Sequence, residues 1–92
     1  MRKEKKMIKV PKVRMAYFIL ESQMDEKGNY RALIAVEGES GYYMTDWFWG
    51  DNLETAEQIA RSKNEAMGVS PEDARLIVLS TMRKGAVENP RF

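Results

Sequence analysis

The apolar residues of this chain change their spacing at Gly50, from every second residue before it to every third or fourth residue after it. Alternation is typical of a half-buried strand, whereas spacing of three and four residues is typical of an amphipathic helix. The sequence therefore predicts strands first and helices second. Strands followed by helices are typical of an α+β domain whose helices pack on one face of an antiparallel sheet.

Three strands are predicted before Gly50. The first covers residues 12–24, begins after Pro11 and is apolar on both sides in its middle. A turn over Asp25–Asn29 leads into a returning strand over Tyr30–Val36, which makes a hairpin. A second glycine-rich break over Gly38–Gly41 is followed by a third predicted strand over Tyr42–Asp46.

The first helix is predicted to begin after Asp51 or Asn52, either of which can accept a hydrogen bond from the first turn. Its apolar stripe runs from Leu53 to Met67, and Gly68 fits the left-handed position that ends many helices. The stripe consists of Leu53, Ala56, Ile59, Ala60, Lys63 and Met67.

Ser70 and Pro71 predict the start of a second helix, which continues to Met82. The alternative is a strand over Leu76–Met82, because Ile77 and Val78 are β-branched. With the helix, the order is β-β-β-α-α. The 92 residues then divide into a basic flexible arm over 1–11, one α+β domain over 12–84 and a tail over 85–92.

Several functional classes conflict with the composition. The chain has no cysteine and no histidine, so disulfides, Cys/His zinc sites and catalytic triads are absent. No carboxylate pair or phosphate-binding loop indicates catalysis, so we expect no enzyme, cofactor or metal. The apolar stretch over 15–20 is shorter than the ~20 residues of a membrane span, and no secretory signal is recognised. We therefore expect a cytoplasmic protein without a membrane partner.

Positive charge is concentrated at the N-terminus. Residues 1–14 carry a net charge of +6, and the remaining residues sum to −5. Such a run is either a nucleic-acid-binding arm or a solvated tail. Translation from Met7 would remove four of the cations. The candidate nucleic-acid contacts are Lys3, Lys5, Lys6, Lys9, Lys12 and Arg14, with Arg31 from the sheet.

Aromatic residues are concentrated in the segment Tyr42–Trp49, which holds five of the nine in the chain and both tryptophans. Strand alternation prevents all of these rings from pointing inward, so some are expected at the surface. There they would contact a protein partner or stacked bases. In the alternative, Trp47 and Trp49 fill the gap between sheet and first helix. The candidate partner-binding residues are Tyr42, Tyr43, Trp47 and Trp49.

The segments Gly41–Gly50, Asn64–Ser70 and Ile77–Met82 resemble a group of small uncharacterised proteins carried by phages, plasmids and integrated mobile elements. The resemblance covers roughly residues 30–83. It brings no assigned activity, and it implies an accessory gene. Such proteins often act by binding a host factor, so the resemblance favours a binding protein over an enzyme.

A looser similarity is to the three-stranded DNA-binding domains of phage and transposon integrases, which insert a sheet face into the major groove. Here Arg14, Lys27 and Arg31 could contact phosphates. Acidic residues around the predicted sheet loops oppose this, because phosphate neutralisation dominates affinity for DNA. We therefore expect a non-enzymatic interaction protein with an aromatic surface. Nucleic-acid binding is the main alternative, and a homodimer would be another way to cover the apolar hairpin.

Overall fold

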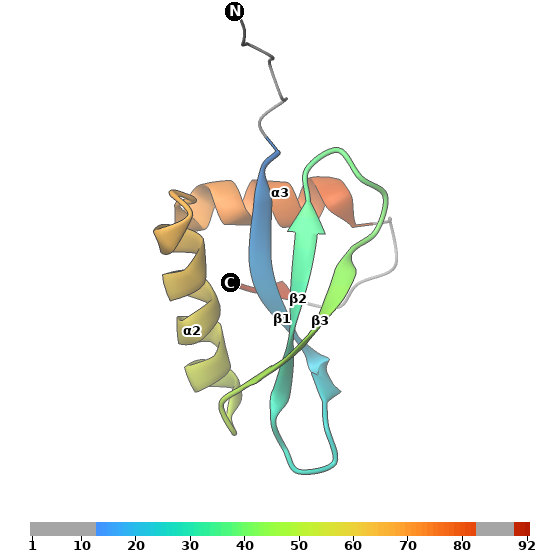
Figure 1. Cartoon of the computed structure of the whole chain (residues 1–92), viewed down its shortest axis with the longest axis vertical. Helices are drawn as coiled ribbons and strands as arrows, with labels where there is room; N and C mark the ends of the chain where they lie inside the picture. Colours follow the sequence, from blue (N-terminus) through green and yellow to red (C-terminus); the bar gives the residue numbers. More distant parts are fainter. Residues whose placement is uncertain (1–12, 83–89) are drawn as a thin grey trace, which may run out of the picture.

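The computed structural model describes residues 13–82 and 90–92, and its sheet is antiparallel with the order β3-β2-β1-β4 (Figure 1). The α+β prediction is confirmed. The sequence predicted three strands and a C-terminal tail, whereas the structure adds a short fourth strand within that segment. The strands are β1 Met15–Met24, β2 Tyr30–Val36, β3 Tyr43–Trp49 and β4 Pro90–Arg91.

The β1–β2 hairpin forms the centre of the sheet. Tyr17 pairs with Ile34, and Phe18 pairs with Leu33. At the turn, the Asp25 carboxylate accepts hydrogen bonds from the backbone N–H groups of Lys27 and Asn29, and these bonds lower the pKa of Asp25, Asn29 contributing most. The turn residues therefore close the hairpin through local hydrogen bonds.

Strand β4 is held at the free edge of β1 by pairing and by charge. Its two residues lie opposite Ile19 and Leu20. The Arg91 guanidinium contacts the Glu57 carboxylate at 3.1 Å and the Glu21 carboxylate at 3.7 Å. A two-residue strand that contains a proline has no alternation to detect, which explains why the sequence did not predict it.

Helix α2 spans Leu53–Ala66 and begins as the sequence predicts. The Asn52 side-chain oxygen accepts a hydrogen bond from the Thr55 N–H at 2.8 Å. Beyond the last turn, Gly68 has a φ of 80° and its N–H donates to the Glu65 carbonyl. The predicted capping residues therefore fix both ends of this helix.

Helix α3 spans Pro71–Thr81, so the helical alternative is confirmed over the strand. The Ser70 hydroxyl accepts a hydrogen bond from the Asp73 N–H at 3.1 Å. Leu76 and Leu79 are exposed because they lie off the stripe that faces the sheet. The buried stripe consists of Ala74, Ile77, Val78 and Thr81.

The sequence predicted that both helices pack on one face of the sheet, and the structure shows that they do not. Successive residues of β1 belong to two separate clusters, because successive side chains of a strand point to opposite faces. Phe18 packs in the cluster of α3, whereas Ile19 packs in the cluster of α2. Figure 1 shows α3 crossing behind the strands and α2 lying beside β1.

A polar side chain places α2 at this edge. The Asn64 amide is buried, accepts a hydrogen bond from the Tyr17 N–H at 2.7 Å and donates one to the Tyr17 carbonyl at 3.0 Å. It thereby satisfies the strand backbone as a neighbouring strand would. Small residues, Ala56 and Ala60, bring the helix close to the sheet. Helix α2 thus covers the edge of β1 and only part of the second face.

Candidate binding surface

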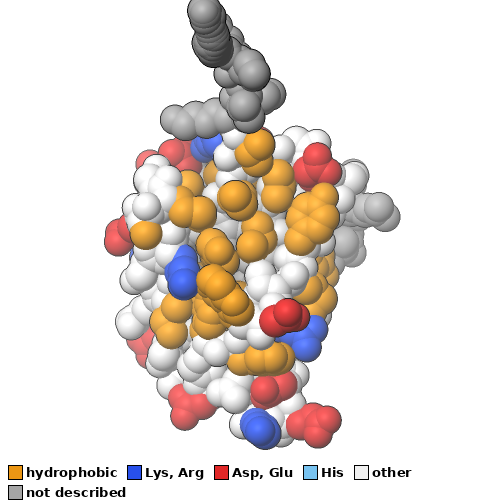
Figure 2. Space-filling model, in the orientation of Figure 1, with side chains coloured by type: hydrophobic (Ala, Val, Ile, Leu, Met, Phe, Trp, Pro, Cys, Tyr) orange, Lys and Arg blue, Asp and Glu red, His pale blue; other side chains and the backbone are white. Residues whose placement is uncertain are grey.

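The part of the second face that α2 leaves uncovered is an apolar surface made by three strands. Tyr17, Ile34 and Tyr43 form a row across β1, β2 and β3, and Met15 pairs with Val36 beside it. Figure 2 shows hydrophobic side chains gathered over these strands on the face turned away from α3. We call this surface the open face, and it consists of Met15, Tyr17, Ile34, Val36, Tyr43 and Trp47.

An irregularity in β3 brings Trp47 to the open face. The five residues Met44–Phe48 lie opposite only three residues of β2, Arg31–Leu33. The Thr45 hydroxyl donates to the Ala32 carbonyl at 2.8 Å and accepts a hydrogen bond from the Trp47 N–H at 3.1 Å. Thr45 therefore fixes a bulge, a feature that commonly redirects side chains at sheet edges.

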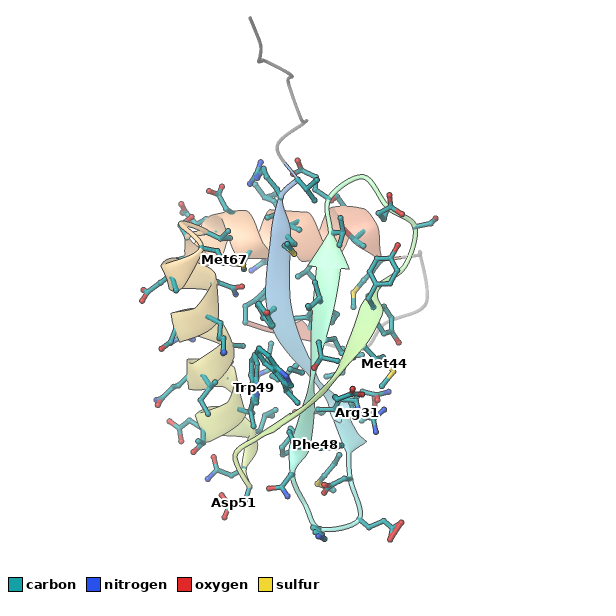
Figure 3. The ribbon with its side chains drawn as sticks, in the orientation of Figure 1. Arg31, Met44, Phe48, Trp49, Asp51 and Met67 are labelled. Atoms are coloured by element: carbon teal, nitrogen blue, oxygen red, sulfur yellow. The ribbon has the colours of Figure 1, made fainter. Side chains whose placement is uncertain are left out.

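Three aromatic rings meet where the open face approaches α2. The rings of Tyr17 and Trp47 are stacked, with centroids 5.9 Å apart and an interplanar angle of 12°. Trp49 lies 5.3 Å from Tyr17 and 5.7 Å from Trp47. Figure 3 shows Trp49 between α2 and the strands. The buried ring of Trp49 thus supports the two rings that remain accessible.

Lys63 of α2 adds a cation to this cluster. Its Nζ atom lies 4.1 Å from the centroid of the Trp47 ring and 5.7 Å from that of Trp49. Attraction between an ammonium and a ring face contributes about 0.5–1 kcal/mol at an exposed site. Lys63 therefore restrains Trp47 and places positive charge at the α2 side of the open face.

Negative charge lies at the opposite side of the open face, next to β3. The Tyr43 hydroxyl donates to the Glu39 carboxylate at 3.1 Å. That hydrogen bond raises the pKa of Tyr43, with the negative charge of Glu39 as the second cause. Asp46 precedes Trp47 and is exposed. The open face thus has an apolar centre with charges of opposite sign at its two sides.

The four aromatic residues proposed as partner contacts fall into two groups. Tyr43 is 53% exposed and Trp47 is 43% exposed, and both belong to the open face. Trp49 is only 7% exposed and belongs to the core. Tyr42 packs edge-on against Phe18 in the cluster of α3, at a centroid distance of 5.8 Å. Of the four, Tyr43 and Trp47 are thus accessible, Trp49 is buried, and Tyr42 is partly buried against Phe18.

The cations proposed as nucleic-acid contacts are not brought together in the described residues. Arg14 is engaged with carboxylates of Glu37 at 3.2 Å and Asp73 at 3.6 Å. Arg31 lies over the ring of Phe48, 5.2 Å from its centroid, and pairs with Phe48 across β2 and β3. The remaining candidates lie outside the described residues: Lys3, Lys5, Lys6, Lys9 and Lys12.

Sequence reasoning missed four members of this surface: Met15, Tyr17, Ile34 and Val36. The sequences of β1 and β2 did carry a signal for these residues, because both strands are apolar on both sides. Such strands predict a cover on each face. The missing information was the position of α2, which depends on the contact between Asn64 and Tyr17 across 47 residues of sequence.

A groove continues the open face towards the turn between the helices. Met15 belongs to both, and the groove adds Val13, Met67 and Val69 as apolar walls. Figure 3 shows Met67 at the end of α2 that lies nearest to α3. Methionine side chains adapt their shape to a contact. The apolar surface thus extends beyond the sheet, with Arg14 and Asp73 at its polar margin.

The described part of the chain contains neither a metal-binding cluster nor a membrane-spanning helix. No group of three or more histidine, cysteine, aspartate or glutamate side chains is placed to hold a metal ion among residues 13–82 and 90–92. Over the same residues, no helix is long and apolar enough to span a membrane.

The chain was compared with protein-family models, with curated proteins and with solved structures. No family model, curated protein or solved structure matches it.

Proposed function

We propose that this chain is a small non-enzymatic interaction protein that binds a protein partner through its open face. The observation that carries the proposal is an apolar sheet face, left uncovered by α2, on which Tyr43 and Trp47 are about half exposed. Uncovered apolar patches on small domains usually mark contact surfaces. Tyrosine and tryptophan are the residues most enriched at the energetic centres of such contacts.

The support of the rings favours this role. Trp47 is held by stacking on Tyr17, by Lys63 above it and by the bulge at Thr45. A side chain that is already fixed loses little conformational entropy when a partner covers it. The partner would therefore meet a rigid aromatic surface. From the resemblance described above, we infer that the chain serves as an accessory factor of a mobile element, with a host or element protein as the partner.

Charge favours a protein over a nucleic acid as the ligand of this face. Glu39 borders the open face through its hydrogen bond with Tyr43, and Arg14 is engaged with two carboxylates. Neutralisation of phosphates dominates nucleic-acid affinity, and carboxylates oppose it. Nucleic-acid binding by the basic N-terminal segment stays the alternative function, and it predicts an affinity that falls steeply with added salt.

The test is a capture experiment with a built-in control. Tagged full-length protein is incubated with lysate of its natural host, with and without nuclease, and the bound proteins are identified by mass spectrometry. Trp47→Ala and Tyr43→Ala should each reduce the captured partner at least tenfold, since truncation of a central contact costs more than about 1.4 kcal/mol.

Phe48→Ala is the matched control. Phe48 is 43% exposed, as Trp47 is, and lies next to it on the same strand. It pairs with Arg31 on the opposite face. The control variant should capture the partner as the unmodified chain does. Equal losses in Trp47→Ala and Phe48→Ala, or a partner that disappears with nuclease, would contradict the proposal.

A further inference from the structure

The layout of charge on the open face identifies one occupant that the chain itself can supply. Lys63 projects from α2, which lies beyond β1, and its ammonium lies over the rings of Trp47 and Trp49. Glu39 lies at the other side, where it accepts the hydrogen bond from Tyr43 of β3. Strand β2 lies between them, because the order is β3-β2-β1.

A two-fold axis turns this layout into a complementary one. Consider an axis in the plane of the open face that passes over Ile34 of β2. When this axis runs along the strands, the 180° rotation exchanges the two sides of the sheet and places the α2 side of one copy opposite the β3 side of the other. Such a contact joins each residue to a different residue of the same surface. Lys63 of each copy then faces Glu39 of the other. The apolar residues of the two open faces meet between these pairs.

We propose that a second copy of this chain covers the open face, in a two-fold dimer that pairs Lys63 of each copy with Glu39 of the other. This inference rests on the proposed function only in treating the open face as a contact surface. The contact follows the packing of two sheets in β-sandwiches, whose inner faces interdigitate about 10 Å apart. Because the same rings cannot contact a partner and a second copy together, dimer formation would limit partner binding.

The expected dimer is weak. Its apolar centre has six side chains per copy, whereas a stable interface uses about 20–30 residues from each side. We therefore expect a dissociation constant in the micromolar range. Sedimentation equilibrium of the full-length chain from about 1 µM to about 1 mM covers that range. The chain should change from monomer to dimer across it.

A charge swap tests the pairing. Lys63→Glu alone places two acidic pairs in the homodimer, and Glu39→Lys alone places two basic pairs there. Each variant should weaken the homodimer about tenfold, since both pairs become repulsive. In an equimolar mixture of the two variants, a mixed dimer has two attractive pairs. The mixture should therefore regain the dissociation constant of the unmodified chain.

The mixture also separates pairing from local damage. Lys63→Glu removes the cation above Trp47, and Glu39→Lys removes the acceptor of the Tyr43 hydroxyl. Mixing would not repair either loss, so recovery requires contact between copies. The control for net charge is Lys27→Glu, which makes the same change at the exposed hairpin turn. It should leave the dissociation constant within about twofold.

Two results would overturn the inference. One is a chain that stays monomeric throughout the concentration range, and the other is a mixture that associates no more tightly than either variant alone. The proposed function is judged separately by capture. A monomeric chain that still loses its partner in Trp47→Ala would keep the proposed function and remove the dimer. A chain that forms the dimer but captures no protein would keep the dimer and remove the proposed function.

Discussion

Helices α2 and α3 are attached to the sheet in different ways. Helix α3 lies across its face and meets it with Ile77 and Val78, both fully buried. Helix α2 lies along the edge of β1, where its two alanines pack in one cluster with the ring of Trp49 from β3 and its Asn64 amide bonds to the backbone of Tyr17. An attachment through a sheet face excludes water from that face, whereas an attachment through an edge leaves the neighbouring face uncovered. The open face exists because α2 has the second kind of attachment.

The largest difference is expected between the two tryptophans on the α2 side. Trp49→Ala should lower the free energy of unfolding by about 3–5 kcal/mol, because it removes a buried ring that packs with Ala56 and Ala60. Trp47→Ala should lower it by about 1 kcal/mol, the combined effect of partial stacking and of Lys63. Urea denaturation of both variants measures the difference.

Equal losses in the two variants would contradict the division between supporting and contacting rings. The sequence placed both tryptophans among the candidate partner contacts, whereas the structure gives Trp49 a packing role. Both tryptophans lie in the same strand and point to the same side of it, two residues apart. Only the position of α2, which covers one of them, decides which ring is buried.

The elements with strong local patterns were predictable. The two central strands, both helices and the caps at Asn52 and Ser70 follow from spacing and from single residues that act within a few positions. Strand β3 was predicted to end at Asp46 and continues to Trp49, because the bulge at Thr45 interrupts the alternation without ending the strand. A break in alternation has the same appearance in sequence whether the strand bends or stops.

The features that define the candidate site depend on contacts between distant residues. The sequence placed Lys63 in the stripe of α2 but did not include Asn64, since a polar residue is not expected to face a core. That residue fixes the helix at the edge of the sheet through a contact across 47 positions. Composition indicated that some rings would be exposed. It did not indicate which, because exposure depends on where a separate element comes to lie.

An intermediate effect is expected from the polar link of α2. Asn64→Ala leaves the part-buried N–H and carbonyl of Tyr17 without the partners that Asn64 provides. A fully buried backbone group without a partner costs about 1–3 kcal/mol, and these two groups are only part-buried, so the variant should lose about 2–4 kcal/mol in urea denaturation. Gln58→Ala, an exposed change on the same helix, should stay within about 0.5 kcal/mol.

Hydrogen exchange sharpens the same prediction. In Asn64→Ala the amide of Tyr17 should lose protection, because its hydrogen bond to Asn64 is gone. Ala16 packs in the cluster of α3. Its amide should therefore stay protected from exchange until the whole domain unfolds. Loss of protection throughout β1 would mean that the edge attachment and the face attachment are not independent.

The smallest effect is expected on the α3 side, where the buried polar residue among those described is Thr81. Its hydroxyl lies 2.9 Å from the Val36 carbonyl and 2.7 Å from the Ile77 carbonyl within its own helix. Thr81→Val keeps the shape and removes one donor, so it should cost about 1 kcal/mol in urea denaturation. Thr81→Ser keeps the donor and loses a methyl group, which costs a similar amount by a different route. A loss in Thr81→Val as large as that in Asn64→Ala would show that α3, too, depends on a polar link, and that apolar packing alone does not hold it on its face.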